Sequence, residues 1–429
     1  MGSRAIQFTI SAVFACAAGA PSAAQSLDRV FHFVNTQTPA GFKQVADPIR
    51  GMTEGAQVSV DDAAATLTVH GTADQLAMAE WLFVALDKPA VGQPPAQHAA
   101  SADYHVAGSE DLVRVYYLAH SETPQSLQEM VNLIRSDANM KPAWPNNAVK
   151  AMAMRGTPGQ LGLAEYLIDA LDKPAGQPNQ HSTTLAFPVA PEVAPGSGQV
   201  ARVFYLANVD SPQRMQQTVN LIRSITDMQL VFPYNSLKAL TLRGSADQMA
   251  LAEWLFNGLD KPASQPSQHT ATAEYLAPPG PGNLRNQVVR IFYLAHSEPP
   301  QGPQEMTNLI RVTTDAQGIY PYQGLNAIAM RGSASQVALA SWFFDTLDQP
   351  SPNPSTQEFP IPGASNDVAR VFYLTHTATP EAVQELSTLI RTTASIMRLF
   401  PYSPPKALAM RGTPDQLALA AKLIQERDQ

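Results

Sequence analysis

The hydrophobic and polar positions of this chain change period in a fixed order, and the same order recurs along its length. The segment 202–208, "RVFYLAN", is short, β-branched and aromatic, which predicts a buried strand. An amphipathic helix is predicted next, because apolar residues recur at i, i+3, i+4 and i+7. One copy shows this spacing at Leu127, Met130, Val131 and Ile134. An N-cap hydroxyl followed by proline starts this helix at Thr38-Pro39, Thr123-Pro124, Ser211-Pro212 and Thr379-Pro380.

A strand pair and a second helix complete the predicted unit. Segments 229–235 and 237–244 have the composition of two strands joined by a tight turn around Asn235. The second helix begins at a capping box, in which Ser or Thr is followed three residues later by Gln. The five boxes are Thr72/Gln75, Thr157/Gln160, Ser245/Gln248, Ser333/Gln336 and Thr413/Gln416. The predicted fold class is α+β, built from β-α-β-β-α modules with both helices on one face of a small sheet.

The unit occurs five times without an internal gap, so each copy is predicted to be one folded module. Four copies end on a motif of the type "FNGLDKP", residues 256–262, and the last ends on the worn version "IQERDQ". We interpret the Leu of this motif as the last core residue of the second helix, Asp-Lys as its solvated end and Pro as its stop. The predicted modules, each of about 60 residues, are the divergent copy 29–89, then 114–174, 202–262 and 290–350, and the terminal copy 370–429.

Proline-rich linkers join the modules, at 90–113, 175–201, 263–289 and 351–369. Three of them contain a Gln-His pair followed, six residues after the His, by an aromatic residue: Tyr104, Phe187 or Tyr275. A piece such as "TAEYLAP" has the composition of a strand, preceded by semi-stiff proline-rich chain. The sequence leaves open whether these pieces add an edge strand to the module that follows.

Composition and charge narrow the compartment and the partners. The 429 residues carry a net charge of −8. This argues against nucleic acid or anionic lipid as the partner, because binding to either requires clustered Lys and Arg. Residues 1–24 combine one basic residue, an apolar run and small residues before the expected cleavage point, which predicts a signal peptide and export. No other stretch is apolar enough for a transmembrane helix in the mature chain. The only cysteine, Cys16, lies in a weak acylation motif, so a lipoprotein is the alternative to a soluble exported protein.

The repeated unit resembles a known family. Its "V-x-x-F/Y-L" strand, amphipathic helix, strand pair ending in Gly and capped helix ending in "LDKP" are similar to the short, ring-building N-terminal domains of bacterial secretins, most closely at 245–262. The resemblance implies small periplasmic modules that contact one another, or that contact secretion or pilus machinery. Secretins continue into a β-rich channel domain, whereas this sequence stops at Gln429, so the resemblance does not extend to channel formation.

No catalytic, cofactor or metal site is predicted, and we expect a non-enzymatic protein. The sequence contains no CxxC, HExxH, GxSxG or phosphate-binding glycine loop. At one repeated position Asn replaces His, which indicates a turn or loop hydrogen bond and not a metal ligand. The residues at this position are Asn35, His120, Asn208, His296 and His376.

Charged residues recur as well. Three of the second helices carry a glutamate that the other copies lack, and we interpret these residues as solvated charges: Glu80, Glu165 and Glu253. Arginines recur at three positions of the module. The first position holds Arg29, Arg114, Arg202, Arg290 and Arg370; the second holds Arg50, Arg135, Arg223, Arg311 and Arg391; the third holds Arg155, Arg243, Arg331 and Arg411, with His70 in the first copy. Arg135 and its counterparts either bind carbonyl groups near the end of the first helix or form a row of cations for an acidic partner or a neighbouring subunit.

The two end copies depart from the common pattern. Pro48 replaces a leucine in the first helix of the first copy, so we expect it to end or kink that helix and to make this module the least stable. Beside the core stripe of the second helix, four copies carry an aromatic residue and the fifth carries Lys422; the aromatics are Trp81, Tyr166, Trp254 and Trp342. We predict that these four rings make inter-module contacts by seating the segment after each module, and that Lys422 marks the free end. The alternative is that each ring fills the edge of its own module.

Two functions agree with these patterns. The first is a periplasmic or outer-envelope interaction or scaffold protein whose partners are envelope proteins or other copies of itself. The alternative is a protein that binds the cell wall or another glycan through repeated Arg and exposed aromatic residues. Neither function uses a cofactor, and the sequence leaves open whether the modules form a ring, a rod or a flexible string.

Overall fold

The structure of the chain is a computed structural model. The structure describes residues 26–429 apart from 90–96, 122, 175, 177–180, 197, 264–268, 278–286, 352–356, 364–365, 378 and 404–405. The predicted signal peptide, with Cys16, lies outside the described residues. Among the described residues, no helix has the length and apolar character needed to cross a membrane.

The α+β fold and the β-α-β-β-α order are confirmed. In the third copy β11 (Val200–Tyr205) leads to α5 (Pro212–Thr226), then β12 (Leu230–Tyr234), β13 (Ala239–Gly244) and α6 (Ala246–Leu259). The third strand lies in the middle of the sheet and is antiparallel to the other two, giving the order β11-β13-β12.

The other four copies repeat this order. The first consists of β1 (Leu27–His32), α1 (Pro39–Met52), β2 (Gln57–Asp61), β3 (Thr66–Gly71) and α2 (Ala73–Leu86); the second of β6 (Leu112–Tyr117), α3 (Pro124–Asp137), β7 (Ala143–Asn146), β8 (Ala151–Gly156) and α4 (Pro158–Leu171). The fourth consists of β16 (Gln287–Tyr293), α7 (Gln301–Thr314), β17 (Gly318–Tyr322), β18 (Ala327–Ser333) and α8 (Ala334–Leu347); the fifth of β20 (Val368–Tyr373), α9 (Pro380–Thr393), β21 (Arg398–Tyr402), β22 (Ala407–Gly412) and α10 (Pro414–Arg427).

Local capping sets the start of every α-helix in the described part of the chain except α7, which begins after Pro300 without a side-chain cap. The hydroxyls of Thr38, Thr123, Ser211 and Thr379 each accept a hydrogen bond from the backbone N–H three residues on. All five second helices have a complete capping box, in which the Gln side chain also accepts from the backbone of the N-cap residue. Each such pair satisfies two backbone donors that a helix N-terminus otherwise leaves without a partner.

The linkers add strands to four modules, which answers the question that the sequence left open. The added strands are β4 (Ala99–Ala100), β5 (Tyr104–His105), β9 (Ser182–Thr183), β10 (Phe187–Pro188), β14 (Thr270–Ala271), β15 (Tyr275–Leu276) and β19 (Gln357–Pro360). All of them pair antiparallel with the first strand of the module that follows, on the side away from the third strand. Among the described residues, β1 of the first copy has no such partner.

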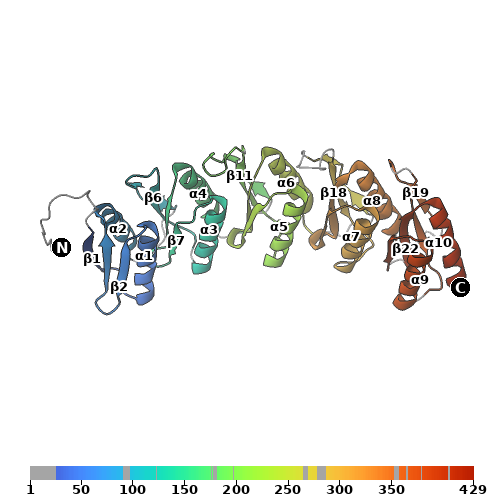
Figure 1. Cartoon of the computed structure of the whole chain (residues 1–429), viewed down its shortest axis with the longest axis horizontal. Helices are drawn as coiled ribbons and strands as arrows, with labels where there is room; N and C mark the ends of the chain where they lie inside the picture. Colours follow the sequence, from blue (N-terminus) through green and yellow to red (C-terminus); the bar gives the residue numbers. More distant parts are fainter. Residues whose placement is uncertain are drawn as a thin grey trace, which may run out of the picture.

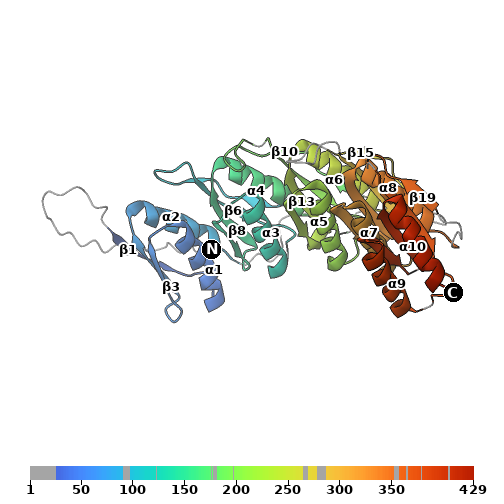
Figure 2. The ribbon, with the colours of Figure 1, turned by 45° about the vertical axis from the view of Figure 1, so that its right-hand side comes forward.

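The five modules lie side by side in one row, in chain order (Figures 1 and 2). The first helix of each module packs against the second strand of the next: α1 on β7, α3 on β12, α5 on β17 and α7 on β21. One apolar cluster, for example, joins Leu221 and Leu251 of the third module to Ile291 and Ala329 of the fourth. Each of these sheets is therefore covered by its own helices on one face and by the preceding helices on the other.

This stacking explains the burial of the central strands. All six residues of β13 are buried, although a strand with one covered face buries only alternate residues. The central strand β3 of the first copy, with no module before it among the described residues, alternates between buried and less buried positions. A single module therefore carries only part of the apolar core that its sheet uses.

Pro48 does not end the helix in which it lies. The helix α1 continues to Met52 and has the same length as α3, 14 residues, with Pro48 buried inside it. The expectation of an early end is therefore wrong. The packing of α1 against α2, β2 and β7 holds the helix beyond the proline.

Replacing Pro48 should still stabilise the first module. Proline has no backbone N–H, so it removes one main-chain hydrogen bond from the interior of a helix. We expect Pro48→Leu, which restores the residue type of the other copies, to stabilise α1 by about 1–3 kcal/mol. Slower hydrogen exchange in residues 39–52 and a higher melting temperature would show this. The control is Pro39→Ala, because Pro39 is at the first helical position and blocks no main-chain bond there; equal effects of both changes would contradict the explanation.

Candidate functional site: the junctions between modules

The four predicted aromatics all lie at junctions, each against an aromatic residue of the following linker. Each ring is partly buried, and the corresponding Lys422 of the fifth module is exposed. The pairs and their ring-centroid distances are Trp81–Tyr104, 5.6 Å; Tyr166–Phe187, 4.8 Å; Trp254–Tyr275, 5.3 Å; and Trp342–Phe359, 5.6 Å. The structure thus places each of the four residues between its own helix and the strand that leads into the next sheet.

We expect Trp254→Ala to loosen the junction between the third and fourth modules. The substitution removes the ring that contacts Tyr275 but leaves the buried stripe of α6, which includes Met249 and Phe256, in place. Limited proteolysis should then cut faster within 263–289, while the third module stays folded by hydrogen exchange. If the third module unfolds instead and cleavage of the linker is otherwise unchanged, the ring is part of the module's own core.

The third-position arginines reach across the junctions. Each donates from Nη1 to a backbone carbonyl at the C-terminal end of the preceding module's first helix, where helix carbonyls lack internal partners and the helix dipole favours a cation. The pairs are Arg155 with Met52, Arg243 with Asp137, Arg331 with Ile225 and Arg411 with Thr313. In the first copy His70 takes this position and instead contacts Asp28 of its own sheet, at 2.7 Å.

At each junction a tyrosine binds the second helix of the preceding module. The last tyrosine of the first strand donates to a carbonyl near the end of the preceding second helix: Tyr117 to Ala85, Tyr205 to Ala170, Tyr293 to Gly258 and Tyr373 to Thr346. The lysine of the closing motif lies over the same ring at three junctions, as Lys88 over Tyr117, Lys173 over Tyr205 and Lys261 over Tyr293. The C-terminal ends of both helices of the preceding module are thus bound by side chains of the next module.

The other two sets of arginines act within their own modules. The second-position arginines bind carbonyls, but in their own second strand and not at the end of the first helix: Arg50 to Val58, Arg135 to Ala143, Arg223 to Val231, Arg311 to Ile319 and Arg391 to Leu399. The first-position arginines bind the glutamates of the second helix, as Arg29–Glu80, Arg114–Glu165 and Arg202–Glu253. These glutamates remain partly exposed, as their interpretation as solvated charges predicts, and each is in addition paired with an arginine of its own module.

In the last two copies the first-position arginine finds other partners. Arg290 donates to the Ser341 hydroxyl, which replaces the glutamate, at 2.9 Å. Arg370 pairs with Glu358 of β19, because Ala421 offers no acceptor on α10. The arginine thus keeps an acceptor in all five copies, although the residue that supplies it changes.

The aspartate of the closing motif is also placed differently from the sequence expectation. Asp348 is fully buried and accepts from the backbone N–H of Ala295 and His296 and from the Ser297 hydroxyl, at 2.7, 2.9 and 3.0 Å. It is not a solvated helix end but the acceptor that fixes the loop after the first strand. Asp87, Asp172, Asp260 and Asp428 bind the same loop in their own copies.

The fifth copy keeps this aspartate although it lost the flanking Leu and Pro. Burial alone would raise the pKa of Asp428, but donors from Thr375, Thr377 and His376 hold the pKa well below its usual range. The repeated His/Asn position lies in this same loop. Asn35 and Asn208 add a side-chain bond to the aspartate's own carbonyl, which agrees with the predicted loop hydrogen bond.

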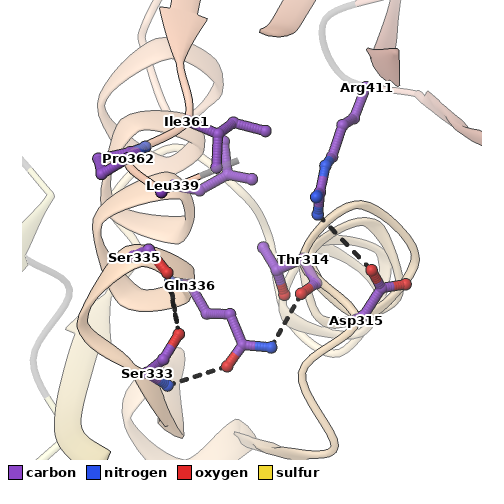
Figure 3. Close-up of a pocket in the computed structure, with 10 residues that line it drawn as sticks. Thr314, Asp315, Ser333, Ser335, Gln336, Leu339, Ile361, Pro362 and Arg411 are labelled. Atoms are coloured by element: carbon purple, nitrogen blue, oxygen red, sulfur yellow. Dashed lines mark hydrogen bonds and ion pairs between the residues drawn. The ribbon is translucent and has the colours of Figure 1, made fainter. Parts of the chain in front are cut away.

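A hollow of about 450 Å³ lies at the last junction (Figure 3). It is lined by the start of α8, the end of α7, the linker residues Ile361 to Gly363, and Arg411. Its polar groups already bind one another: Gln336 bridges Ser333 and the Thr314 carbonyl, and Arg411 contacts Asp315. The described residues that line the hollow include no nucleophile–base pair, so we assign no chemistry to it.

The chain matches no protein-family profile and no curated protein sequence. Solved structures similar to parts of it include the N-terminal domain of the secretin XcpQ from Pseudomonas aeruginosa, at 14% identity and a TM-score of 0.16, with 35% of this chain and 63% of that chain covered. The type II secretion secretin GspD of E. coli K12 is 9% identical, with a TM-score of 0.13 and coverage of 56% and 39%. A protein of unknown function from Aeropyrum pernix is 13% identical, with a TM-score of 0.18 and coverage of 33% and 80%.

The chain thus spans less than two thirds of the length of the XcpQ domain. Two of the three structures are secretins or secretin domains, the proteins that the repeated motif resembles. What the modules do is argued below from their own contacts.

Proposed function

We propose that the chain is an exported, non-enzymatic scaffold protein of the cell envelope that holds partner proteins along a row of five docked modules. The observation that carries this proposal is the junction itself. Each one joins two modules through a shared apolar cluster, an arginine and a tyrosine on the preceding helix ends, and an aromatic pair. Four such junctions favour a rod over a flexible string, and a rod fixes the spacing between bound partners.

The glycan-binding alternative is less favoured, because the residues that it would use already contact other parts of the chain. The four predicted aromatics contact linker aromatics, and the third-position arginines bind helix ends and acidic side chains. Side chains engaged in this way are not available to stack on sugar rings or to bind carboxylates of a cell wall. The proposal therefore keeps proteins as the partners, with secretion or pilus machinery as the class that the resemblance suggests.

The tagged full chain should enrich envelope proteins, and purified cell wall should not retain it. Arg331→Met should reduce this enrichment several-fold, because it loosens one junction and with it the spacing of the bound proteins. Arg311→Met is the matched control, since Arg311 is exposed and bonds only within its own module. Retention by cell wall without enrichment of any envelope protein would overturn the proposal in favour of the glycan alternative.

A further inference from the structure

The free edge of the first strand is filled in the same way in three of the modules. A short linker strand pairs with each end of the first strand, and a Ser or Thr between the two pieces makes both bonds to the central residue. In the fourth module the Thr272 hydroxyl accepts from the N–H of Ile291 at 3.1 Å, and the Thr272 N–H donates to the Ile291 carbonyl at 2.9 Å. Ser101 with Val115 and Thr184 with Val203 repeat this arrangement.

A histidine anchors the start of each of these linker strands. Three residues before the Ser or Thr, the linker histidine binds a polar residue near the end of the same module's second helix. The pairs are His98–Asp169 at 2.8 Å, His181–Asn257 at 2.6 Å and His269–Asp345 at 2.9 Å. The occupant of the edge is thus recognised by two features, a polar anchor and a hydroxyl three residues later.

The first module presents the same edge without an occupant among the described residues. Its strand β1 pairs only with β3, so the central Val30, the counterpart of Val115, keeps an unpaired outer backbone edge in this part of the chain. The anchor position also differs, because Val84 replaces the Asp or Asn of the second, third and fourth copies. Val84 is 65% exposed, and Val34 in the neighbouring loop is 71% exposed.

These two differences belong together. An open strand edge is a template for another strand, and proteins normally cover or charge it. Here the edge is bordered by exposed apolar side chains, with Leu27 and Val30 also about half exposed. A linker of the type found in the other copies would place its histidine against Val84, where it would find no acceptor.

We propose that the edge of β1 binds an extended segment of a second protein that carries an apolar residue in place of the anchoring histidine and a Ser or Thr three residues later. The segment adds antiparallel to β1, its hydroxyl accepts from the Val30 N–H, and its apolar residue contacts Val84. This site deepens the proposed scaffold role by naming where and how one partner attaches.

A peptide taken from the chain's own linker provides the probe. Residues 267–277, "SQHTATAEYLA", are made with His269→Val and with the native histidine, and each is titrated by fluorescence anisotropy against the chain from residue 26 onward, which comprises every described residue. We expect the valine peptide to bind about tenfold more tightly than the histidine peptide, because one buried aliphatic contact distinguishes them. Binding should also slow hydrogen exchange at Val30.

The substitution Val84→Asp copies the anchor of the fourth module and should reverse the preference. Val84 is exposed, so this change leaves the fold intact, and the histidine peptide should now bind better than the valine peptide. A Thr272→Pro peptide, which lacks both the hydroxyl and the N–H, should bind neither protein. Failure of the valine peptide to bind, or an unchanged preference with Val84→Asp, would overturn the site. Enrichment of envelope proteins by the same Val84→Asp chain would leave the scaffold role standing.

Discussion

Asp348→Ala should unfold the loop between β16 and α7 and destabilise the fourth module by about 3–5 kcal/mol. Hydrogen bonds to a buried carboxylate are each worth about 1.5–3 kcal/mol, and the buried donors that lose their acceptor remain without one. Asp348 is fully buried and accepts from two backbone N–H groups and one hydroxyl. Hydrogen exchange of the full chain should become faster throughout 287–351, and the melting transition of this region should fall.

Asp345→Ala is the matched control for this prediction. Asp345 lies one turn earlier on α8, is largely exposed, and bonds to His269 at 2.9 Å. Exposed ion pairs contribute about 0–1 kcal/mol, so this change should have little effect on the same segment. If both substitutions produce the same small change, the loop is held by other contacts and our account of the repeated aspartate is wrong.

The junction between the second and third modules should weaken as the pH rises. Asp137 is fully buried at the end of α3, where the other copies have Met52, Ile225, Thr313 and Thr393. Burial raises the pKa of Asp137 to about 7; Thr241 and Arg243 oppose this, but neither completes a hydrogen bond to the carboxylate in the described part of the chain. The protonated acid is therefore the stable form inside the junction.

Because the pKa of Asp137 is raised in the folded protein, the stability of the junction falls with rising pH. The contribution of the protonated Asp137 to this stability is fully present below the ordinary aspartate pKa near 3.8 and is lost as the pH rises through about 7. Asp137→Asn should remove this pH dependence and make the junction more stable than the wild type at pH 8 by a few kcal/mol, since one pKa unit is worth about 1.4 kcal/mol. At pH 4 the two proteins should be alike.

Segment-resolved hydrogen exchange at pH 5 and pH 8 checks this prediction. The junction between the third and fourth modules is an internal control, because Ile225 takes the place of Asp137 there. Equal pH dependence in wild type and Asp137→Asn would show that the carboxylate is not buried in the working molecule.

Local features of the fold could be predicted from the sequence, and long-range ones could not. The capping boxes, the helix stripes and the strand pair depend on residues close together in the sequence, so their patterns are visible in one copy. The hydrogen bond that Asp348 accepts from the Ala295 N–H spans 53 residues, and an acid at a helix end looks the same in sequence whether it is solvated or buried. A useful signal was the retention of Asp428 in the fifth copy after its neighbours had changed.

The contacts across junctions were still harder to predict from the sequence. Arg331 and Ile225 are 106 residues apart, and their contact exists only because one sheet packs on the preceding helices. The sequence did hold a hint, since His70 replaces this arginine in the first copy just as Lys422 replaces the aromatic in the fifth. The role of the linker histidines was missed as well, although the hydroxyl three residues after each of them was visible.

Because each sheet after the first packs on the helices of the preceding module, we expect the modules to fold in chain order. A chain that emerges from the ribosome or through a membrane pore delivers its first module before its last. When the strands of the fourth module appear, α5 of the third is already in place as a template for β17 and β18. Each module would thus condense onto a surface that its predecessor has finished, and the unfinished helix face would always lie at the growing end.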